Sequence, residues 1–252
     1  LQNSPPTELA EFLFDTIEIL DNNKFTKNED QFFKNFNRYD VAYHMDASLF
    51  GEWLKNVYCK PRGVKHIIGT FKNANLTENG YVESIELMNS EKIYDADLFV
   101  DCTGFKGILS QQTLKTDRIS FKSILINDRA LATTIPYTDK NIEMETNTNA
   151  TTMNAGWCWN IPLYNRIGTG YVYSSQFLTE DEAEKEFREY LLKHRLPFAN
   201  KEPLRDISRI KIKSGVKKEA WTKNVVAVGL NCGFIEPLES TGLLFTHNTI
   251  RD

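Results

Sequence analysis

The chain has 252 residues, of which 41% are hydrophobic and 25% are charged, and its formal net charge at pH 7 is −4. This composition is typical of a globular protein with a sizeable core, and the mild acidity argues against a nucleic-acid-binding surface. No apolar run approaches the ~18 residues of a transmembrane helix and no signal peptide is recognisable, so we expect a cytoplasmic protein without a membrane span.

The first half of the chain predicts two amphipathic helices followed by β-structure. Apolar residues recur at helical spacing over residues 7–20 and again over residues 46–60. Residues 66–71 (HIIGTF) are apolar and β-branched, which predicts a strand. Residues 81–87 (YVESIEL) alternate between two faces and predict a second strand, flanked by turns. Residues 96–104 (ADLFVDCTG) predict a short buried strand that ends in a polar loop.

The second half of the chain predicts more strands and two further helices. In chain order we expect strand structure over 119–134, a polar loop over 138–154, two strands of a hairpin or meander over 156–163 and 167–175, a helix over 179–195, a strand over 205–215, a buried strand over 225–230, and a helix that begins near Gly242. Together these elements predict an α/β sheet with an antiparallel accessory ribbon.

Neither the cysteines nor the histidines show a metal-binding spacing. The four cysteines, Cys59, Cys102, Cys158 and Cys232, form no CxxC pair, and the four histidines form no HExxH motif. Each cysteine stands beside apolar or aromatic residues, so reduced and buried thiols are expected. We therefore expect no metal site.

Residues 233–245 (GFIEPLESTGLLF) place Glu236 and Glu239 in an apolar stretch after the predicted buried strand. A strand, a Gly-rich loop and a helix start are the usual place for a ligand in α/β proteins. The free N–H groups at the helix start favour an anion, and Gly242 permits close approach to the backbone. Glu239 could then act as a general base or electrostatic stabiliser. From the residues alone, capping of the helix by Glu239 or Ser240 is an equally good explanation.

Two other stretches are candidates for a site. Residues 100–105 (VDCTGF) end a strand with Asp101 and Gly104, which could bring the backbone to a cofactor; taken alone, an ordinary exit from a strand is the better explanation. Trp157 and Trp159 stand two residues apart and so point to one face of a strand. Core packing or a cross-strand aromatic pair is the usual reason for such a pair.

In their order along the chain, these stretches resemble the flavin-dependent tryptophan halogenase family. The resemblance covers roughly residues 39–252 and rests on two motifs. The W-x-W-x-I-P motif and the F-x-x-P-x-x-S-x-G motif of that family match Trp157, Trp159, Ile161 and Pro162, and Phe234, Pro237, Ser240 and Gly242, respectively.

The resemblance implies an α/β fold with an FAD-binding sheet domain of the glutathione-reductase-like, monooxygenase type and an antiparallel β-rich substrate module. Residues 1–112 would form part of the FAD-binding domain, with residues 1–38 unplaced. Residues 113–221 would form the β-rich substrate-side module. Residues 222–252 would return to the FAD-binding domain with the halide loop and the helix start.

The activity implied by the resemblance needs reduced FAD, supplied by a separate flavin reductase, together with O2 and a halide ion. The flavin hydroperoxide would oxidise the halide to hypohalous acid, which would halogenate an electron-rich aromatic substrate such as tryptophan or another indole. A homo-oligomer is one possible assembly, and no nucleic-acid or membrane partner is implied. Two alternatives stay open: an FAD monooxygenase of similar fold that hydroxylates its substrate, and a truncated flavoprotein fragment without catalytic activity.

The resemblance also implies roles for individual residues. The backbone groups of Thr241 and Gly242 would hold the halide beside the flavin. Glu239 would be the catalytic glutamate, and Ser240 would lie next to the substrate. The tryptophans of the first motif would keep the substrate away from the flavin. The positions that match contacts to FAD are Val64, Asp101, Gly104, Leu230 and Leu243.

Two features of the family are not identifiable in this sequence. The family begins with a GxGxxG motif, and a catalytic lysine follows further along, but residues 1–38 show neither. We therefore expect the chain to be a piece of a longer protein that lacks this N-terminal region and the C-terminal helical part. The 252 residues alone are expected to bind FAD weakly and not to halogenate.

Overall fold

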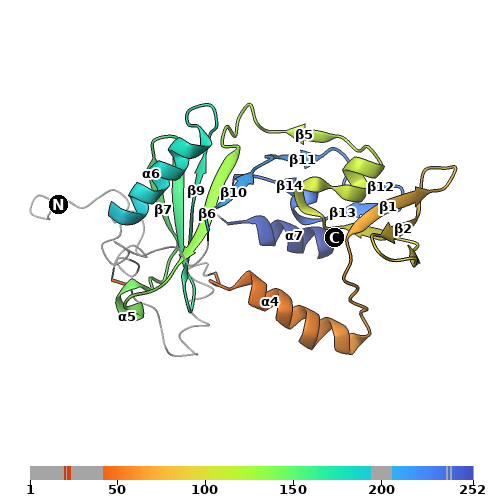
Figure 1. The fold of residues 1–252 in the computed structure, drawn as a ribbon, viewed down its shortest axis with the longest axis horizontal. Coiled ribbons are helices and arrows are strands. Elements are labelled where there is room, and N and C mark those ends of the chain that lie inside the picture. Colours follow the sequence, from red (N-terminus) through yellow and green to blue (C-terminus); the bar gives the residue numbers. More distant parts are fainter. Residues whose placement is uncertain are drawn as a thin grey trace, which may run out of the picture. The chain divides into compact units, whose positions relative to one another are not determined.

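The computed structural model describes residues 20, 22–23, 42–193, 206–236, 238 and 240–251. It is a mixed α/β structure with several sheets (Figure 1). The helix predicted over residues 7–20 lies outside the described residues except for Leu20. The chain divides into two compact units, each assembled from three separate stretches. The first comprises Leu1–Leu54, Leu131–Tyr171 and Glu180–Ser208, and the second comprises Lys55–Ala130, Val172–Thr179 and Arg209–Asp252.

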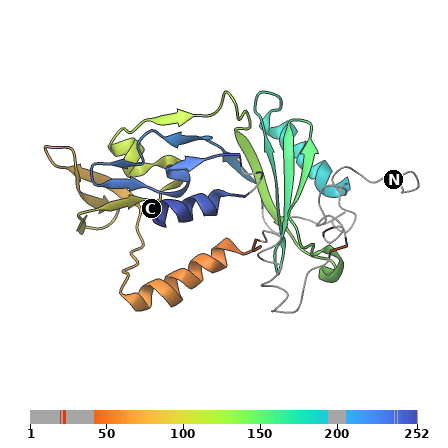
Figure 2. The ribbon, with the colours of Figure 1, turned by 180° about the vertical axis from the view of Figure 1, so that it is seen from behind.

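Most of the first unit is a five-stranded sheet with a helix on one face (Figures 1 and 2). The strand order is β10-β6-β9-β8-β7, with β6 (Arg129–Ile135), β7 (Asn149–Met153), β8 (Gly156–Pro162), β9 (Ile167–Tyr173) and β10 (Ser208–Lys211). Helix α6 (Glu180–Lys193) buries Ala183, Phe187 and Tyr190, which share one face at helical spacing. The strands predicted over 156–163, 167–175 and 205–215 and the helix predicted over 179–195 are confirmed.

The loop predicted over residues 138–154 is wrong, because this range contains a helix and a strand. Asp139 caps helix α5 (Lys140–Glu143), and its carboxylate accepts a hydrogen bond from the backbone N–H of Asn141 at 2.9 Å. β7 pairs antiparallel with β8. It is the last strand of the sheet, and its side chains are alternately half-buried and exposed, which explains its polar composition. The threonines of β7 also favour strand structure.

The helix predicted over residues 46–60 is confirmed. Helix α4 (Ala47–Trp53) begins at Asp46, whose carboxylate accepts hydrogen bonds from the first free backbone N–H groups. It continues as a π-helical turn η1 (Leu54–Cys59) and a 3₁₀ turn η2 (Lys60–Arg62). The helical stretch ends at Gly63, which has a left-handed backbone with φ 86°.

The strand predicted over residues 66–71 is wrong, because the ladder begins only at Phe71. β1 (Phe71–Leu76) pairs antiparallel with β2 (Val82–Leu87), and Phe71 lies opposite Leu87. Residues 64–70 are exposed, and Ile68 has 89% of its surface accessible. An apolar, β-branched composition does not make a strand where no neighbouring strand accepts its backbone hydrogen bonds.

The second unit holds three small sheets. Their strand orders are β1-β2-β3 with β3 (Ile93–Asp95), β14-β11-β5 with β14 (Gly233–Phe234), β11 (Gly215–Lys217) and β5 (Arg118–Ser120), and β12-β13-β4 with β12 (Trp221–Thr222), β13 (Val225–Ala227) and β4 (Phe99–Asp101). The strand structure expected over 119–134 is thus two strands, β5 and β6, separated by residues 121–128. Within β2 the predicted alternation holds over residues 82–84, where Val82 and Ser84 are buried and Glu83 is exposed, but residues 85–87 are all half-buried.

A hydrophobic core joins the strands of the second unit to its short helical turns. Val82, Phe99, Leu109 and Val225 form one buried cluster. The side chain of Asn224 holds β2 against this cluster, because it accepts from the N–H of Val82 at 3.0 Å and donates to its carbonyl at 2.8 Å. The remaining elements of the unit are η3 (Gly104–Lys106), η4 (Ile108–Thr113), η6 (Gly229–Asn231) and α7 (Gly242–Arg251).

Candidate functional site

The ends of two parallel strands bring together the two loops that the sequence analysis singled out in the second unit. β4 and β13 pair in parallel, with Phe99 opposite Val225 and Asp101 opposite Ala227. The carboxyl ends of both strands therefore lie at one edge, where α/β proteins commonly bind ligands. The loop after β4 carries Gly104, and the loop after β13 carries η6.

Asp101 is buried at this edge and fixes the loop that follows it. One carboxylate oxygen accepts from the N–H and hydroxyl of Thr103 at 3.2 and 2.6 Å, and the other accepts from the N–H groups of Leu109 and Ser110 at 3.0 and 2.8 Å. Burial acts to raise the pKa of this carboxyl, but the hydrogen bonds outweigh it and hold the pKa below its usual value. The Asp101 side chain therefore shapes the loop.

Asn231 joins the two loops across the strand ends. Its amide donates to the backbone carbonyl of Asp101 at 2.9 Å, and its side-chain oxygen accepts from the Ser110 hydroxyl at 3.1 Å. Gly107 adjoins this contact, and a Cβ there would lie only 2.6 Å from the Asn231 side-chain oxygen. The sharp packing of the first loop on η6 therefore depends on a glycine at this position.

A cavity of about 730 Å³ lies beside η6 and the start of α7. This volume is in the range of sites for organic ligands. Its lining is mainly apolar side chains and glycines, with a few hydroxyl groups and one thiol. The lining residues are Phe121, Gly215, Val216, Gly229, Leu230, Cys232, Gly233, Phe234, Ile235, Ser240, Thr241, Gly242, Leu243, Phe245, Thr246 and Thr249.

The start of α7 is open toward a ligand. α7 begins at Gly242, as predicted, and a Cβ at this position would meet nothing within 4 Å. Ser240 has a left-handed backbone with φ 55°, which is uncommon for a residue other than glycine and often marks a functional loop. The carbonyl of Thr241 accepts the N–H of Phe245 at 3.0 Å in the first turn of the helix. The backbone N–H groups that precede Phe245 in α7 therefore have no acceptor within the helix.

Six of the residues predicted for the site line this one cavity. They are Leu230, Phe234, Ser240, Thr241, Gly242 and Leu243. Asp101 ends β4 and Gly104 lies in the loop after it; neither lines the cavity, although Asn231 at the end of η6 donates to the Asp101 carbonyl. Val64 is exposed and also lies outside the lining. Pro237 and Glu239 lie outside the described residues.

The tryptophan motif lies on β8, in the first unit. Trp157, Trp159 and Ile161 alternate with the buried Cys158, Asn160 and Pro162, so they share the other face of the strand. The rings of Trp157 and Trp159 are 6.1 Å apart, with an interplanar angle of 59°. The buried face packs under α6, where the amide of Asn160 donates to the Tyr190 hydroxyl at 2.6 Å.

Gly170 on β9 has no side chain and so leaves the space that the Trp159 ring occupies. A Cβ at Gly170 would lie 2.2 Å from two ring atoms of Trp159 and 2.3 Å from the carbonyl oxygen of Leu131. We expect Gly170→Ala to displace the Trp159 ring and to lower the free energy of unfolding by about 1–3 kcal/mol. Urea unfolding and the near-ultraviolet circular dichroism of the tryptophans measure both effects.

Gly168→Ala is the matched control for this prediction. Gly168 lies on the same strand, but a Cβ there would meet its nearest atom, the Ile161 carbonyl oxygen, at an ordinary 3.8 Å. Equal losses in the two variants would show that Gly170 serves strand flexibility rather than the placement of Trp159.

Comparison with known proteins decides the family. The family model described as tryptophan halogenase matches residues 2–252. The chain belongs to the tryptophan halogenase family. This match also includes residues 2–38, which the resemblance had left unplaced.

Individual tryptophan halogenases are similar over most of this chain. Tryptophan 7-halogenase RebH of Lentzea aerocolonigenes is 39% identical over 208 residues, which are 82% of this chain and 38% of RebH. The 7-chloro-L-tryptophan 6-halogenase KtzR of Kutzneria sp. strain 744 is 38% identical over 213 residues, which are 84% of this chain and 40% of KtzR. The apo structure of VirX1 matches with a TM-score of 0.86 and 43% identity over 98% of this chain and 46% of VirX1. The chain therefore spans less than half the length of these relatives.

Several lining residues of this halogenase-family chain were not found from the sequence. Thr246 and Thr249 follow Gly242 by four and seven residues, so helical spacing would have placed all three on the cavity side of α7. Phe121 directly follows β5 and Gly215 begins β11, and no local signal connects them to α7. Their position depends on pairing between distant strands.

Arg118 connects two walls of the cavity. Its guanidinium donates to the carbonyl of Asn231 at 3.2 Å and to the carbonyl of Gly215 at 2.8 Å. Burial lowers the pKa of Arg118. The nearby thiol of Cys232 has its pKa raised by burial, although Arg118 and Lys217 act in the opposite direction. A neutral thiol is therefore expected in the cavity wall at neutral pH.

The described part of this family member shows neither a membrane-spanning helix nor a metal-binding cluster. No helix there is long and apolar enough to cross a lipid bilayer. Within the same part of the chain, no group of three or more His, Cys, Asp or Glu side chains is arranged to hold a metal ion.

Proposed function

We propose that this chain is the flavin- and halide-binding part of an FAD-dependent halogenase that acts on tryptophan or another indole. The observation that carries the proposal is the cavity, because five positions matched to the family's flavin, halide and substrate contacts line it together with Phe234 of the second motif. The relatives RebH and KtzR are named as halogenases of tryptophan and 7-chloro-L-tryptophan, which supports an indole substrate.

The cavity fits the flavin ring of FAD. A flat aromatic ring needs apolar walls and close approach of the backbone, and the lining supplies Leu230, Phe234 and Leu243 together with Gly229 and its neighbouring glycines. Gly229 has a left-handed φ of 68°, a conformation that glycine adopts without strain. Bound reduced FAD would supply the electrons with which O2 becomes able to oxidise a halide.

The residues of the chain would organise this chemistry around the start of α7. Its free backbone N–H groups and the positive end of its dipole attract an anion, which supports a halide site at Thr241 and Gly242. We assign proton transfer at the reacting centre to Glu239, because it directly precedes the Ser240-Thr241-Gly242 stretch at the start of the helix. Ser240 would contact the substrate, and Trp157 with Trp159 would keep the substrate apart from the flavin.

The proposal extends to the architecture and the partners of the whole protein. We assign the second unit's parallel strands β4 and β13 to an FAD-binding domain of the glutathione-reductase-like type, with Val64, Asp101 and Gly104 on its flavin side. We also propose that the FAD-binding domain ends at residue 112 and resumes at residue 222, with the β-rich substrate-side module over residues 113–221. A separate flavin reductase would supply the reduced FAD, and the cytoplasm is the proposed compartment.

The proposed function is tested with the full-length protein, a flavin reductase with NADH, FAD, tryptophan and either bromide or chloride. Mass spectrometry of the product is the readout. Halogenated tryptophan that appears only with added halide would support the proposal. Hydroxylated tryptophan would identify a monooxygenase instead, and bound flavin without any product would identify a non-catalytic flavoprotein.

Thr241→Asp tests the proposed halide site. A carboxylate about 4 Å from a bound halide would repel it by several kcal/mol at an effective dielectric constant of about 20, so the apparent KM for halide is expected to rise at least about tenfold. An acidic residue next to a helix N-terminus does not disfavour the helix itself. Steady-state kinetics at varied bromide concentrations measure the change.

Thr241→Asn is the matched control, because its side chain has nearly the shape of aspartate without the charge. Its KM for halide is expected to stay within a few-fold of the unsubstituted protein. If aspartate leaves the KM unchanged, the halide binds elsewhere.

A further inference from the structure

Glu236 is the carboxylate of the 233–245 stretch to which the proposed function gives no role. Glu236 follows the lining residue Ile235 and precedes Ser240, in the residues that join β14 to α7. Its side-chain oxygen accepts a hydrogen bond from the Asn127 amide at 3.0 Å, and this contact is partly buried. Because a carboxylate only accepts hydrogen bonds, Asn127 must present its NH₂ group here.

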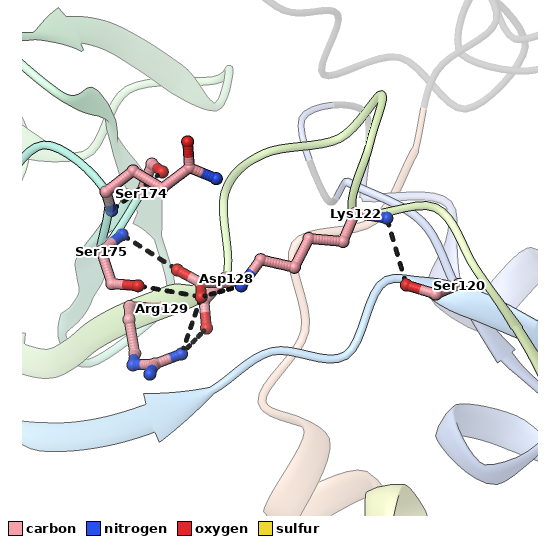
Figure 3. A network of polar contacts seen from close by, with 7 residues as sticks. Ser120, Lys122, Asp128, Arg129, Ser174 and Ser175 are labelled. Atoms are coloured by element: carbon pink, nitrogen blue, oxygen red, sulfur yellow. Dashed lines mark hydrogen bonds and ion pairs between the residues drawn. The ribbon is translucent and has the colours of Figure 1, made fainter.

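Asp128, the residue after Asn127, is 7% exposed and lies in a network of polar contacts (Figure 3). The Asp128 carboxylate accepts from the N–H and the hydroxyl of Ser175, both at 2.9 Å. It also pairs with Lys122 at 3.2 Å and with Arg129 at 3.0 Å. Burial acts to raise the pKa of Asp128, but these partners outweigh it and hold the pKa below its usual value, so the carboxylate stays charged at neutral pH.

The backbone of Asp128 is fixed as well. Its N–H donates to the carbonyl of Tyr173 at 3.2 Å, and its carbonyl accepts the N–H of Ile212 at 2.9 Å. Asp128 is thus held by residues that adjoin β9 and β10, through both side chain and backbone. One residue earlier in the chain, Asn127 has little freedom to leave Glu236.

The other end of the 121–128 segment is fixed at the cavity. The N–H of Phe121 donates to the carbonyl of Ser214 at 3.1 Å, and its own carbonyl accepts the N–H groups of Ile124 and Leu125 at 2.9 and 2.8 Å. Phe121 itself lines the cavity. The segment therefore has one fixed end in the cavity wall and the other at the Asp128 network.

We propose that Asn127 is a positioning residue for Ser240 and Thr241 of the proposed halide site, and that it acts through Glu236. The hydrogen bond from Asn127 holds the Glu236 carboxylate in one orientation. Ser240 and Thr241 then face the cavity, and the negative charge of Glu236 stays away from the anion that the start of α7 attracts. The relevance of this hydrogen bond to halide binding rests on the proposed function. The hydrogen bond itself is a property of the protein without any ligand.

An exchange of the two side-chain chemistries tests the proposal. Asn127→Asp places a second carboxylate next to that of Glu236, and their repulsion breaks the hydrogen bond. Glu236→Gln keeps an oxygen that can accept from Asn127. The double variant Asn127→Asp with Glu236→Gln restores a hydrogen bond with donor and acceptor reversed, at nearly the same volume and the same net charge as the unsubstituted protein.

The first readout is hydrogen–deuterium exchange of the full-length protein without flavin, for peptides that cover residues 233–241. We expect Asn127→Asp to speed exchange there about tenfold, while the exchange of β13 stays constant and the double variant returns toward the unsubstituted rate. Unchanged exchange in Asn127→Asp, or a double variant as fast as Asn127→Asp, would overturn the proposal.

The second readout separates this inference from the proposed function. In the active enzyme, Asn127→Asp should raise the apparent KM for bromide several-fold more than it lowers kcat, and the double variant should recover it. An equal fall in kcat without a change in KM would contradict a role in halide positioning. If hydrogen–deuterium exchange responds as expected but the unsubstituted protein makes no halogenated product, the proposed function is wrong and the positioning role of the Asn127–Glu236 hydrogen bond is still supported.

Discussion

Replacing Glu239 by Gln is expected to lower kcat for halogenation about 10²- to 10⁴-fold, the usual contribution of a positioned acid or base. Glutamine keeps the size and polarity of the side chain but cannot take up a proton at neutral pH. FAD affinity should change little, because the matched flavin contacts are other residues. Single-turnover kinetics with pre-reduced FAD measure the chemical step, and the flavin absorbance of the oxidised complex measures binding.

Glu236→Gln is the control from the same loop for this prediction. It removes a carboxylate three residues away but retains an acceptor for Asn127, so the loss in kcat should stay below about tenfold. A Glu239→Gln enzyme that forms product at the unsubstituted rate would refute the role assigned to Glu239. Equal losses in both variants would mean that the overall charge of the loop matters, and not one proton acceptor.

Asp101→Asn is expected to lower the free energy of unfolding by about 2–4 kcal/mol, because it disrupts a buried, charge-assisted set of hydrogen bonds. The carboxylate accepts four hydrogen bonds, and an amide would turn an NH₂ group toward two of the donors. Urea unfolding of the full-length protein measures the loss. Asp97→Asn, an exposed position at the start of the same stretch, should change stability by less than about 0.5 kcal/mol.

The pH dependence of this loss follows from the lowered pKa of Asp101. A carboxyl with a lower pKa in the folded state stabilises the fold above its unfolded value near 3.8, and this contribution disappears as the pH falls through the lowered folded value. The difference between the unsubstituted protein and Asp101→Asn should therefore be constant near neutral pH and should narrow below about pH 4.

The same variant separates two roles for Asp101. If Asp101 acts by shaping the loop that packs against Asn231, FAD affinity and unfolding free energy should fall together. If Asp101 contacts FAD directly, affinity should fall in a protein of unchanged stability. The four internal hydrogen bonds of its carboxylate favour the first outcome.

Local patterns in the sequence were sufficient where a residue's environment depends on its near neighbours. Alternation predicted that Val82 and Ser84 share one face of a strand, and the pattern over residues 179–195 predicted helix α6. The helix start at Gly242 followed from the change between an apolar strand and a Ser-Thr-Gly turn. These features involve the 2.0 and 3.6 residue periods of strands and helices, which a short window contains.

The same patterns failed where the outcome depends on distant partners. Residues 66–71 have a strand-like composition, but the ladder requires Leu87 and starts only at Phe71. Residues 149–153 look polar because they form a sheet edge beside β8, which no local window reveals. For the same reason the sequence alone did not show that Phe121 and Gly215 line the cavity, or that Asn127 reaches Glu236.

The parallel pairing of β4 with β13 has a consequence for how the protein is made. Asp101 and Asn231, which close the strand ends, are 130 residues apart in the chain. During synthesis the β4 loop leaves the ribosome long before β13 has been made. Phe99 and Leu109 therefore lack their packing partner Val225 during that time. Pairings over such distances pay a large loop-closure cost and form late. The strand ends that carry the two loops therefore close only after β13 has been synthesised.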